Sequence, residues 1–103
     1  MNIVMAQLNP IVGDISGNLA KLAEVLIQCP PDADLVVFSE LYLVGYPPRD
    51  LLERPAFIRK TREALEEVAR LSQKYPHLGI LVGAPRTTDR ARGKGLANTA
   101  FLF

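Results

Sequence analysis

The sequence of 103 residues lacks tryptophan and contains one cysteine, one histidine and no long apolar run. A single cysteine, Cys29, excludes an intrachain disulfide, and no Cys/His cluster has the spacing of a metal site, so no metal ligands are assigned. A free thiol and the lack of a signal peptide indicate a reducing, cytoplasmic location. No segment approaches the ~20 apolar residues that a membrane-spanning helix needs, so no membrane partner is expected.

The sequence also lacks an excess of charge of either sign. Twelve Lys and Arg residues stand against eleven Asp and Glu residues, which gives a formal net charge of +1. Because nucleic-acid binding depends on concentrated positive charge, this balance argues against a nucleic-acid partner. The one basic run, Arg90, Arg92 and Lys94 around Gly93, is expected to form a solvated hairpin tip, with a nucleotide or phosphate contact as the alternative.

Short apolar runs and helical periodicity predict a single α/β domain. Strands are expected over residues 2–8, 35–38, 79–84 and 95–103, and those over 2–8 and 79–84 are expected to be buried. One helix is expected to follow Asn18 as its N-cap and to stop at Pro30, and a second is expected from Pro55 to about Tyr75. Strands that alternate with helices imply parallel pairing, so the predicted order is β-α-β-α-β-β, with the last two strands antiparallel.

The second predicted helix has two adjacent apolar stripes that are expected to face the core, with charged residues outside. The stripes consist of Ile58, Thr61, Leu65, Val68 and Ser72, and of Phe57, Ala64, Leu71 and Tyr75. The last predicted strand is apolar up to Phe103, where the sequence stops without a polar tail. Four short strands and two helices would leave a sheet edge to be covered, so we expect the front part of a larger domain.

An acidic residue, Glu40, comes directly after the predicted strand over residues 35–38. In α/β folds functional side chains gather beyond the carboxyl ends of strands, and a carboxylate placed there can act as a general base. The alternative is a structural loop acid that pairs with an arginine such as Arg49. Position alone leaves both interpretations open.

The residues around Glu40 favour the catalytic interpretation. The segment from Asp34 to Leu52, including Gly45-Tyr-Pro-Pro-Arg-Asp-Leu-Leu52, resembles the glutamate motif of the nitrilase, or carbon-nitrogen hydrolase, superfamily. Within that superfamily it is most similar to the N-terminal glutaminase domains of glutamine-dependent NAD synthetases. Further matches follow in register: Ile3 to Pro10, Val12-Gly-Asp14 and Asn18, Gly79 to Pro85, and Asn98-Thr-Ala100.

This resemblance implies part of a nitrilase-like α-β-β-α sandwich with a Glu-Lys-Cys catalytic set. Glu40 matches the glutamate, the general base that accepts the proton of the cysteine thiol, while the lysine stabilises the oxyanion. The lysine and cysteine motifs of the family lie beyond the strand that ends near Phe103, so the isolated chain is expected to be inactive. Cys29 matches no motif and is expected to be a structural thiol at a helix end.

For the intact enzyme the resemblance implies glutamine as the substrate of this domain. It also implies ATP, Mg²⁺ and deamido-NAD as ligands of a separate synthetase domain, and assembly as a homo-oligomer. No Gly-rich phosphate loop occurs in these residues, so no cofactor site is expected here. Two alternatives stay open, a stand-alone amidase of small linear amides and a non-catalytic scaffold or assembly module.

Four further residues have narrower predicted roles. Tyr46 is interpreted either as a substrate-binding wall of the glutamine pocket or as a loop anchor stacked on its neighbouring prolines. Tyr42 is expected to be structural, or to be part of an interface in the intact enzyme. Asp14 is expected to make a turn or helix-start contact. His77, which has no partner residues of a catalytic kind nearby in the sequence, is assigned no role.

Overall fold

The computed structural model describes the backbone of residues 1–90 and 93–103, and the side chains of residues 1–48, 50–86 and 98–103. Its elements follow in the order β1 (Ile3–Ala6), α1 (Ile15–Gln28), β2 (Leu35–Phe38), η1 (Arg49–Glu53), α2 (Pro55–Ser72), β3 (Gly79–Arg90) and β4 (Gly93–Leu102). The predicted β-α-β-α-β-β order is confirmed. The short 3-10 helix η1 was not predicted.

The four strands form one sheet in the order β1-β2-β3-β4. The first three are parallel, and β3 and β4 are antiparallel, as predicted. One row of paired residues crosses all four strands, from Met5 through Val37 and Leu81 to Leu102. The register therefore places the carboxyl ends of the parallel strands β1 and β2 at the same edge of the sheet.

The ribbon of β3 and β4 is longer than predicted. Its pairing continues to Arg90 and Gly93, whereas the third strand was expected to end at Ala84. Two antiparallel strands satisfy each other's backbone groups without a covering layer, so this extension needs no apolar pattern. The predicted hairpin tip coincides with the end of this ribbon, but Arg92 and the side chains of Arg90 and Lys94 lie outside the described residues.

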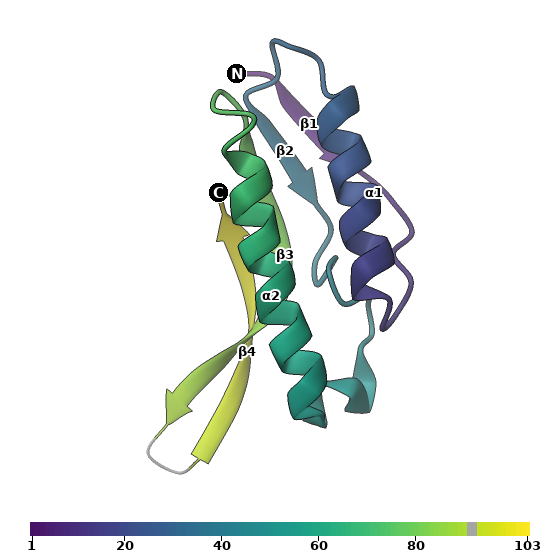
Figure 1. Ribbon diagram of the computed structural model, residues 1–103, viewed down its shortest axis with the longest axis vertical. Coiled ribbons are helices and arrows are strands. Elements are labelled where there is room, and N and C mark those ends of the chain that lie inside the picture. Colours follow the sequence, from purple (N-terminus) through teal and green to yellow (C-terminus); the bar gives the residue numbers. More distant parts are fainter. Residues whose placement is uncertain (91–92) are drawn as a thin grey trace.

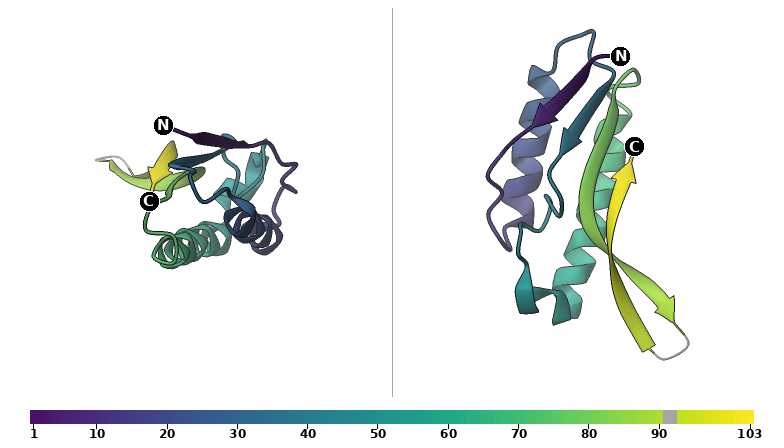
Figure 2. Two further views of the ribbon diagram at one scale, coloured as in Figure 1. Left: turned by 90° about the horizontal axis from the view of Figure 1, so that it is seen from above. Right: turned by 180° about the vertical axis from the view of Figure 1, so that it is seen from behind.

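Both helices lie on the same face of the sheet (Figures 1 and 2). The core lies between them and the sheet, where Leu22, Leu26, Val36, Val68 and Ile80 are at most 1% exposed. Burial of such aliphatic side chains, worth about 1.5–3 kcal/mol each, provides the main stabilisation of this layer. The residues thus form one helix layer and one sheet layer of the predicted sandwich.

The face of the sheet opposite the helices is apolar and uncovered. Alternation along the strands directs Ile3, Met5 and Leu102 to this face, with exposures of 54%, 69% and 70%. The neighbouring residues of the same row, Val37 and Leu81, are partly exposed. The strand over residues 2–8 was predicted to be buried, and that prediction is wrong, because only Ala6 of β1 is buried. We refer to these five residues as the open face.

Helix α1 begins earlier than predicted. Its N-cap is Asp14, whose Oδ1 accepts a hydrogen bond of 3.0 Å from the Gly17 amide, and not Asn18. This contact confirms the helix-start role predicted for Asp14. Asn18 lies within the helix and is fully buried. The helix ends at Gln28, two residues before Pro30, as expected because proline cannot continue a helix.

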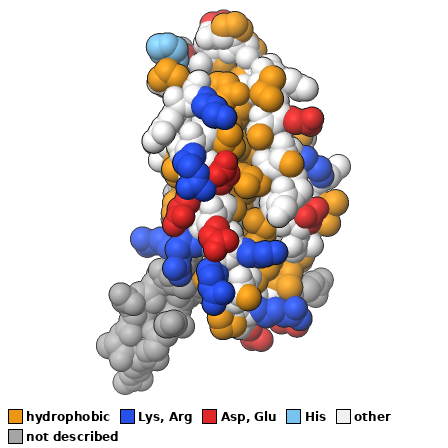
Figure 3. All heavy atoms as spheres, viewed as in Figure 1, with side chains coloured by type: hydrophobic (Ala, Val, Ile, Leu, Met, Phe, Trp, Pro, Cys, Tyr) orange, Lys and Arg blue, Asp and Glu red, His pale blue; other side chains and the backbone are white. Residues whose placement is uncertain are grey.

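Helix α2 confirms its predicted division into a buried and a charged side. Thr61, Ala64 and Val68 are buried, while the other stripe residues are partly buried. Charged side chains of both signs cover the outer side of α2 (Figure 3), among them the ion pair of Arg70 with Glu67 at 2.7 Å. Within the described part of the chain, neither helix combines the length and the apolar character that crossing a bilayer requires.

Candidate active site

A tight turn after β2 places Glu40 at the surface. The four residues that follow it, Leu41 to Val44, are all buried, whereas Ser39 and Glu40 are exposed. Leu41 adopts a positive φ of 53°, and its carbonyl accepts a 2.9 Å hydrogen bond from the Gly45 amide. The apolar residues hold the turn against the core, so the Glu40 carboxylate remains in solvent at the carboxyl end of β2.

The buried side of this turn is anchored by Tyr42 and Asn18. The Tyr42 hydroxyl donates a 2.7 Å hydrogen bond to the Asn18 carbonyl, and its ring centroid lies 5.0 Å from that of Phe38. Burial raises the pKa of Tyr42 to about 12, so its hydroxyl keeps its proton. The Asn18 side chain contacts the backbone of Ile11 and Leu43. Tyr42 is therefore structural, as predicted.

The turn lies directly on the backbone of β3. The Leu43 amide donates to the Gly83 carbonyl at 3.4 Å. A β carbon on Gly83 would come within 2.6 Å of the Leu41 amide nitrogen and 3.3 Å of the Glu40 Cα. Glycine at this position therefore allows the turn to extend over β3 toward β4, where the Asn98 Nδ2 donates a hydrogen bond to the Glu40 Oε1.

Replacing Gly83 by alanine is expected to displace the turn that holds Glu40. The new methyl group would meet backbone atoms, which have little freedom to move, so we expect a loss of about 1–3 kcal/mol in the free energy of unfolding. Gly79→Ala in the same strand is the matched control, because its nearest neighbour is a flexible side-chain atom, Leu35 Cδ1 at 3.1 Å. Urea denaturation of both variants measures the difference, and equal midpoints would contradict the prediction.

Two hollows meet at Glu40. The first, of about 360 Å³, is lined by Asn9, Pro10, Ser39, Glu40 and Tyr46. The second, of about 260 Å³, has Ser39 and Glu40 on one side and residues of β3 and β4, including Leu81, Gly83 and Asn98, on the other. The Glu40 carboxylate therefore borders both hollows. A molecule bound in either hollow could come close enough to exchange a proton with it.

The structure brings together the two site residues predicted from the sequence. Glu40 and Tyr46 line the first hollow, and Tyr46 is 65% exposed. Their predicted roles as general base and substrate-binding wall stay predictions, as does the alternative of a loop anchor for Tyr46. The other alternative, an ion pair of Glu40 with Arg49, is left open because the Arg49 side chain is not described.

The remaining candidates lie away from these hollows. Cys29 is the C-cap of α1 and is partly buried, and this burial raises the pKa of its thiol, which disfavours the reactive thiolate. His77 is exposed in the loop before β3 and lines neither hollow. Cys29 and His77 thus both lie outside the candidate active site.

Sequence reasoning did not assign roles to Asn9, Ser39 or Asn98. Asn9 and Ser39 follow β1 and β2, so the rule that function gathers at the carboxyl ends of strands would have found both. Asn98 lies 58 residues from Glu40 in sequence, and only the pairing of β3 with β4 brings the two together. Its presence in the matched segment Asn98-Thr-Ala100 was the one available signal.

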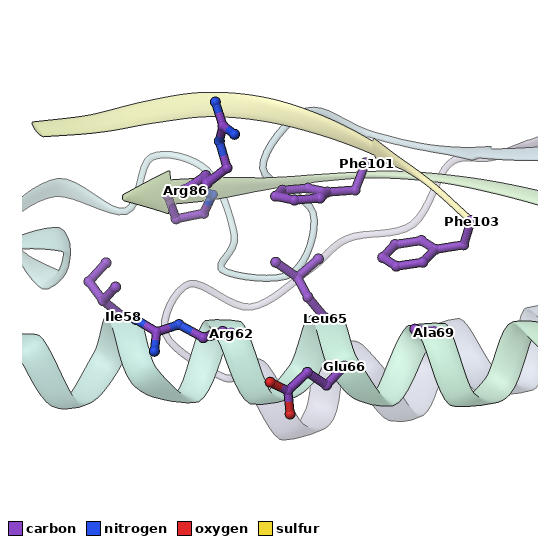
Figure 4. A pocket seen from close by; sticks show the side chains of 9 residues that line it. Ile58, Arg62, Leu65, Glu66, Ala69, Arg86, Phe101 and Phe103 are labelled. Carbon is purple, nitrogen blue, oxygen red and sulfur yellow. The ribbon is translucent and has the colours of Figure 1, made fainter. Parts of the chain in front are cut away.

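A further hollow, of about 410 Å³, lies between α2 and the β3–β4 ribbon (Figure 4). Leu65 and Ala69 of α2 face the rings of Phe101 and Phe103 across it, and Arg62 and Arg86 lie toward one end. The two rings are stacked with centroids 6.4 Å apart. Neither Glu40 nor Tyr46 lines this hollow, so it is separate from the candidate active site.

Comparisons with known proteins identify relatives of this arrangement, although no family model matches the chain. A glutamine-dependent NAD(+) synthetase of Thermotoga maritima is 43% identical over 83 residues, which are 80% of this chain and 14% of that protein. The corresponding protein of Synechocystis sp. is 38% identical over an alignment of 105 positions, which covers 98% of this chain and 18% of that protein. The chain thus spans less than a fifth of the length of these relatives.

Solved structures agree with these relatives. The glutamine-dependent NAD+ synthetase of Acinetobacter baumannii, in complex with ADP, matches 98% of this chain with a TM-score of 0.76 and 28% identity, over 18% of its own length. An amidase from Nesterenkonia sp. matches 99% with a TM-score of 0.74, and at 20% identity it shows the fold alone. A variant of that amidase is described as belonging to the nitrilase superfamily. This chain is therefore homologous to one part of the glutamine-dependent NAD synthetases, and it shares its fold with the amidase of the nitrilase superfamily.

Proposed function

We propose that the chain forms part of the glutaminase unit of a glutamine-dependent NAD synthetase, with Glu40 as its general base. The observation that supports this most directly is the exposed Glu40 carboxylate, which borders two hollows at the carboxyl end of β2. The family relationship extends over 80–98% of the chain, including this turn. Tyr46 lines the same hollow as Glu40 and forms a wall for the substrate side chain.

In this reaction Glu40 accepts the proton of a cysteine thiol as its sulfur attacks the side-chain amide carbon of glutamine. The tetrahedral intermediate collapses when its C–N bond breaks and ammonia leaves with a proton returned from the acid form of Glu40. Water then cleaves the thioester to release glutamate and restore the thiol. The ammonia serves the ATP-dependent amidation of deamido-NAD, and the cysteine and the oxyanion-stabilising lysine come from outside these 103 residues.

The open face supports a site that is completed by further protein. Leu81 of this face also lines the second hollow beside Glu40, so a layer packed on the sheet would close the hollow from above. Burial of a sheet face with side chains such as Met5 and Leu102 is strongly favourable, at about 25 cal/mol per Å² of apolar surface. Exclusion of water from the hollow strengthens the electrostatic interactions of the carboxylate.

The described residues do not fit ATP or Mg²⁺. No group of three Asp, Glu, His or Cys side chains comes together among them, and the sequence contains no Gly-rich phosphate loop. Both ligands therefore belong to another part of the proposed enzyme, and no step that involves them is assigned to these residues.

An ammonia-release assay of two proteins tests the proposal, one the complete product of the gene that encodes these residues and the other the 103-residue chain. We expect the complete product to hydrolyse glutamine and the short chain to be inactive. Hydrolysis of short aliphatic amides but not of glutamine would instead indicate a stand-alone amidase. A complete product of only 103 residues, inactive on both substrates, would favour an assembly module.

The variant Cys29→Ser of the complete product is the control for the nucleophile. Because Cys29 is partly buried at the end of α1 and lines neither hollow at Glu40, the substitution is expected to leave glutamine hydrolysis unchanged. Loss of ammonia release in this variant would assign the nucleophile to Cys29 and overturn the proposed division of the catalytic set.

A further inference from the structure

The Glu40 carboxylate has a hydrogen-bonding partner on β4. Asn98 Nδ2 donates to Glu40 Oε1, and both side chains are exposed. A hydrogen bond between exposed neutral and charged groups contributes little to stability, because water competes for both partners. Its larger effect is on orientation, since the amide restricts the rotation of a carboxylate that otherwise moves freely.

The backbone segments that carry Glu40 and Asn98 both contact strand β3. The register of β3 and β4 pairs Gly83 with Ala100 and Pro85 with Asn98. Gly83 in turn contacts the Glu40 turn, because its carbonyl accepts a hydrogen bond from Leu43. Strand β3 therefore contacts both the turn that carries Glu40 and the strand that carries Asn98, and this fixes the two residues relative to each other.

The hydrogen bond divides the two carboxylate oxygens between two tasks. Oε1 is directed toward β4 by the amide, while the carboxylate also borders the first hollow, which Asn9 and Tyr46 line. A general base needs one oxygen aimed at the proton that it accepts, within hydrogen-bond reach. A neutral amide orients the carboxylate without placing a positive charge beside it. A Lys or Arg partner would form an ion pair that stabilises the carboxylate and makes it a weaker base.

We propose that Asn98 is a positioning residue that orients Glu40 for proton transfer. This inference rests on the proposed function, because it requires Glu40 to be the general base. Asn98 lines the second hollow but not the first, which Glu40 shares with Tyr46, so for a substrate held in the first hollow it acts through Glu40 and makes no contact of its own.

The test compares glutamine-driven and ammonia-driven synthesis by the complete enzyme carrying Asn98→Ala or Asn98→Asp. Loss of the orienting amide is expected to lower kcat with glutamine by about 10- to 100-fold, with KM for glutamine and the ammonia-driven rate unchanged. The Asp variant places a second carboxylate against Oε1 and is expected to lose at least as much. Asn2→Ala is the matched control, since it also removes an exposed amide with a 3.1 Å hydrogen bond, to the Asp32 carbonyl.

A double-mutant cycle with Glu40→Gln separates positioning from general structural support. If Asn98 acts through Glu40, adding Asn98→Ala to Glu40→Gln is expected to cause no further loss of kcat. An undiminished loss in that background, an unchanged kcat in the single Asn98 variants, or an equal loss of the ammonia-driven rate would each overturn the inference. A Glu40→Gln enzyme with full glutamine activity would instead overturn the proposed function.

Discussion

Replacing Glu40 by glutamine in the complete enzyme is expected to slow glutamine-dependent synthesis by about 10²–10⁴-fold. The amide of glutamine cannot accept the thiol proton, so the nucleophile is not activated. Glutamine has nearly the same shape as glutamate, and its side-chain oxygen still accepts the hydrogen bond that Asn98 donates to Glu40 Oε1. The turn after β2 is therefore expected to keep its conformation, and the loss is one of chemistry.

Ammonia-driven synthesis provides the internal control for this variant. Because free ammonia bypasses glutamine hydrolysis, its use is expected to continue at the unmodified rate in Glu40→Gln. Glu24→Gln removes an exposed carboxylate from α1 and is expected to leave both rates unchanged. Equal loss of the two rates in Glu40→Gln would indicate that Glu40 supports folding, as the structural interpretation of a loop acid requires.

The elements with strong local signals were predictable from the sequence. The strand over residues 35–38 coincides with β2, because a short β-branched run is too brief for a helix and ends at polar residues. The start of α2 at Pro55 was also predicted, since proline is well accommodated in the first turn of a helix. In both cases the residues that determine the structure are neighbours in the sequence.

Features that depend on distant residues were not predictable in the same way. The extension of β3 to Arg90 results from its pairing with β4, which compensates for the lack of apolar residues. Asn18 resembled an N-cap because asparagine is common there, but Asp14 caps the helix. Asn18 is buried by the turn that contains Leu43, 25 residues away in the sequence, and no local sequence pattern indicates that contact.

The candidate site shows the same division. Glu40 was found from its place after a strand and from the surrounding motif, both of which are local. Its partner Asn98 comes from a different strand, and its position depends on the register of β3 against β4 and on the space above Gly83. The position of Glu40 is thus encoded locally, whereas the orientation of its side chain is a property of the assembled sheet.

Asn18→Ala is expected to be the most destabilising of the substitutions considered, with a loss of about 3 kcal/mol in the free energy of unfolding. The Asn18 side chain accepts a 2.9 Å hydrogen bond from the Ile11 amide and donates to the carbonyls of Ile11 at 2.9 Å and Leu43 at 3.1 Å. Alanine leaves these three backbone groups without this partner, and the residue is 0% exposed.

Thermal unfolding followed by circular dichroism measures this loss, which corresponds to a fall of roughly 12–24 °C in Tm for a domain of this size. Asn18→Asp separates hydrogen bonding from packing, because aspartate fills the same volume but cannot donate to the carbonyls of Ile11 and Leu43 when ionised. It is expected to destabilise about as much as alanine. Ser16→Ala, at an exposed position of the same helix, is expected to change stability by less than about 0.5 kcal/mol. If Asn18→Asp retained full stability, the side chain would act by filling space, and the loop at Ile11 and the turn at Leu43 would be held by other contacts.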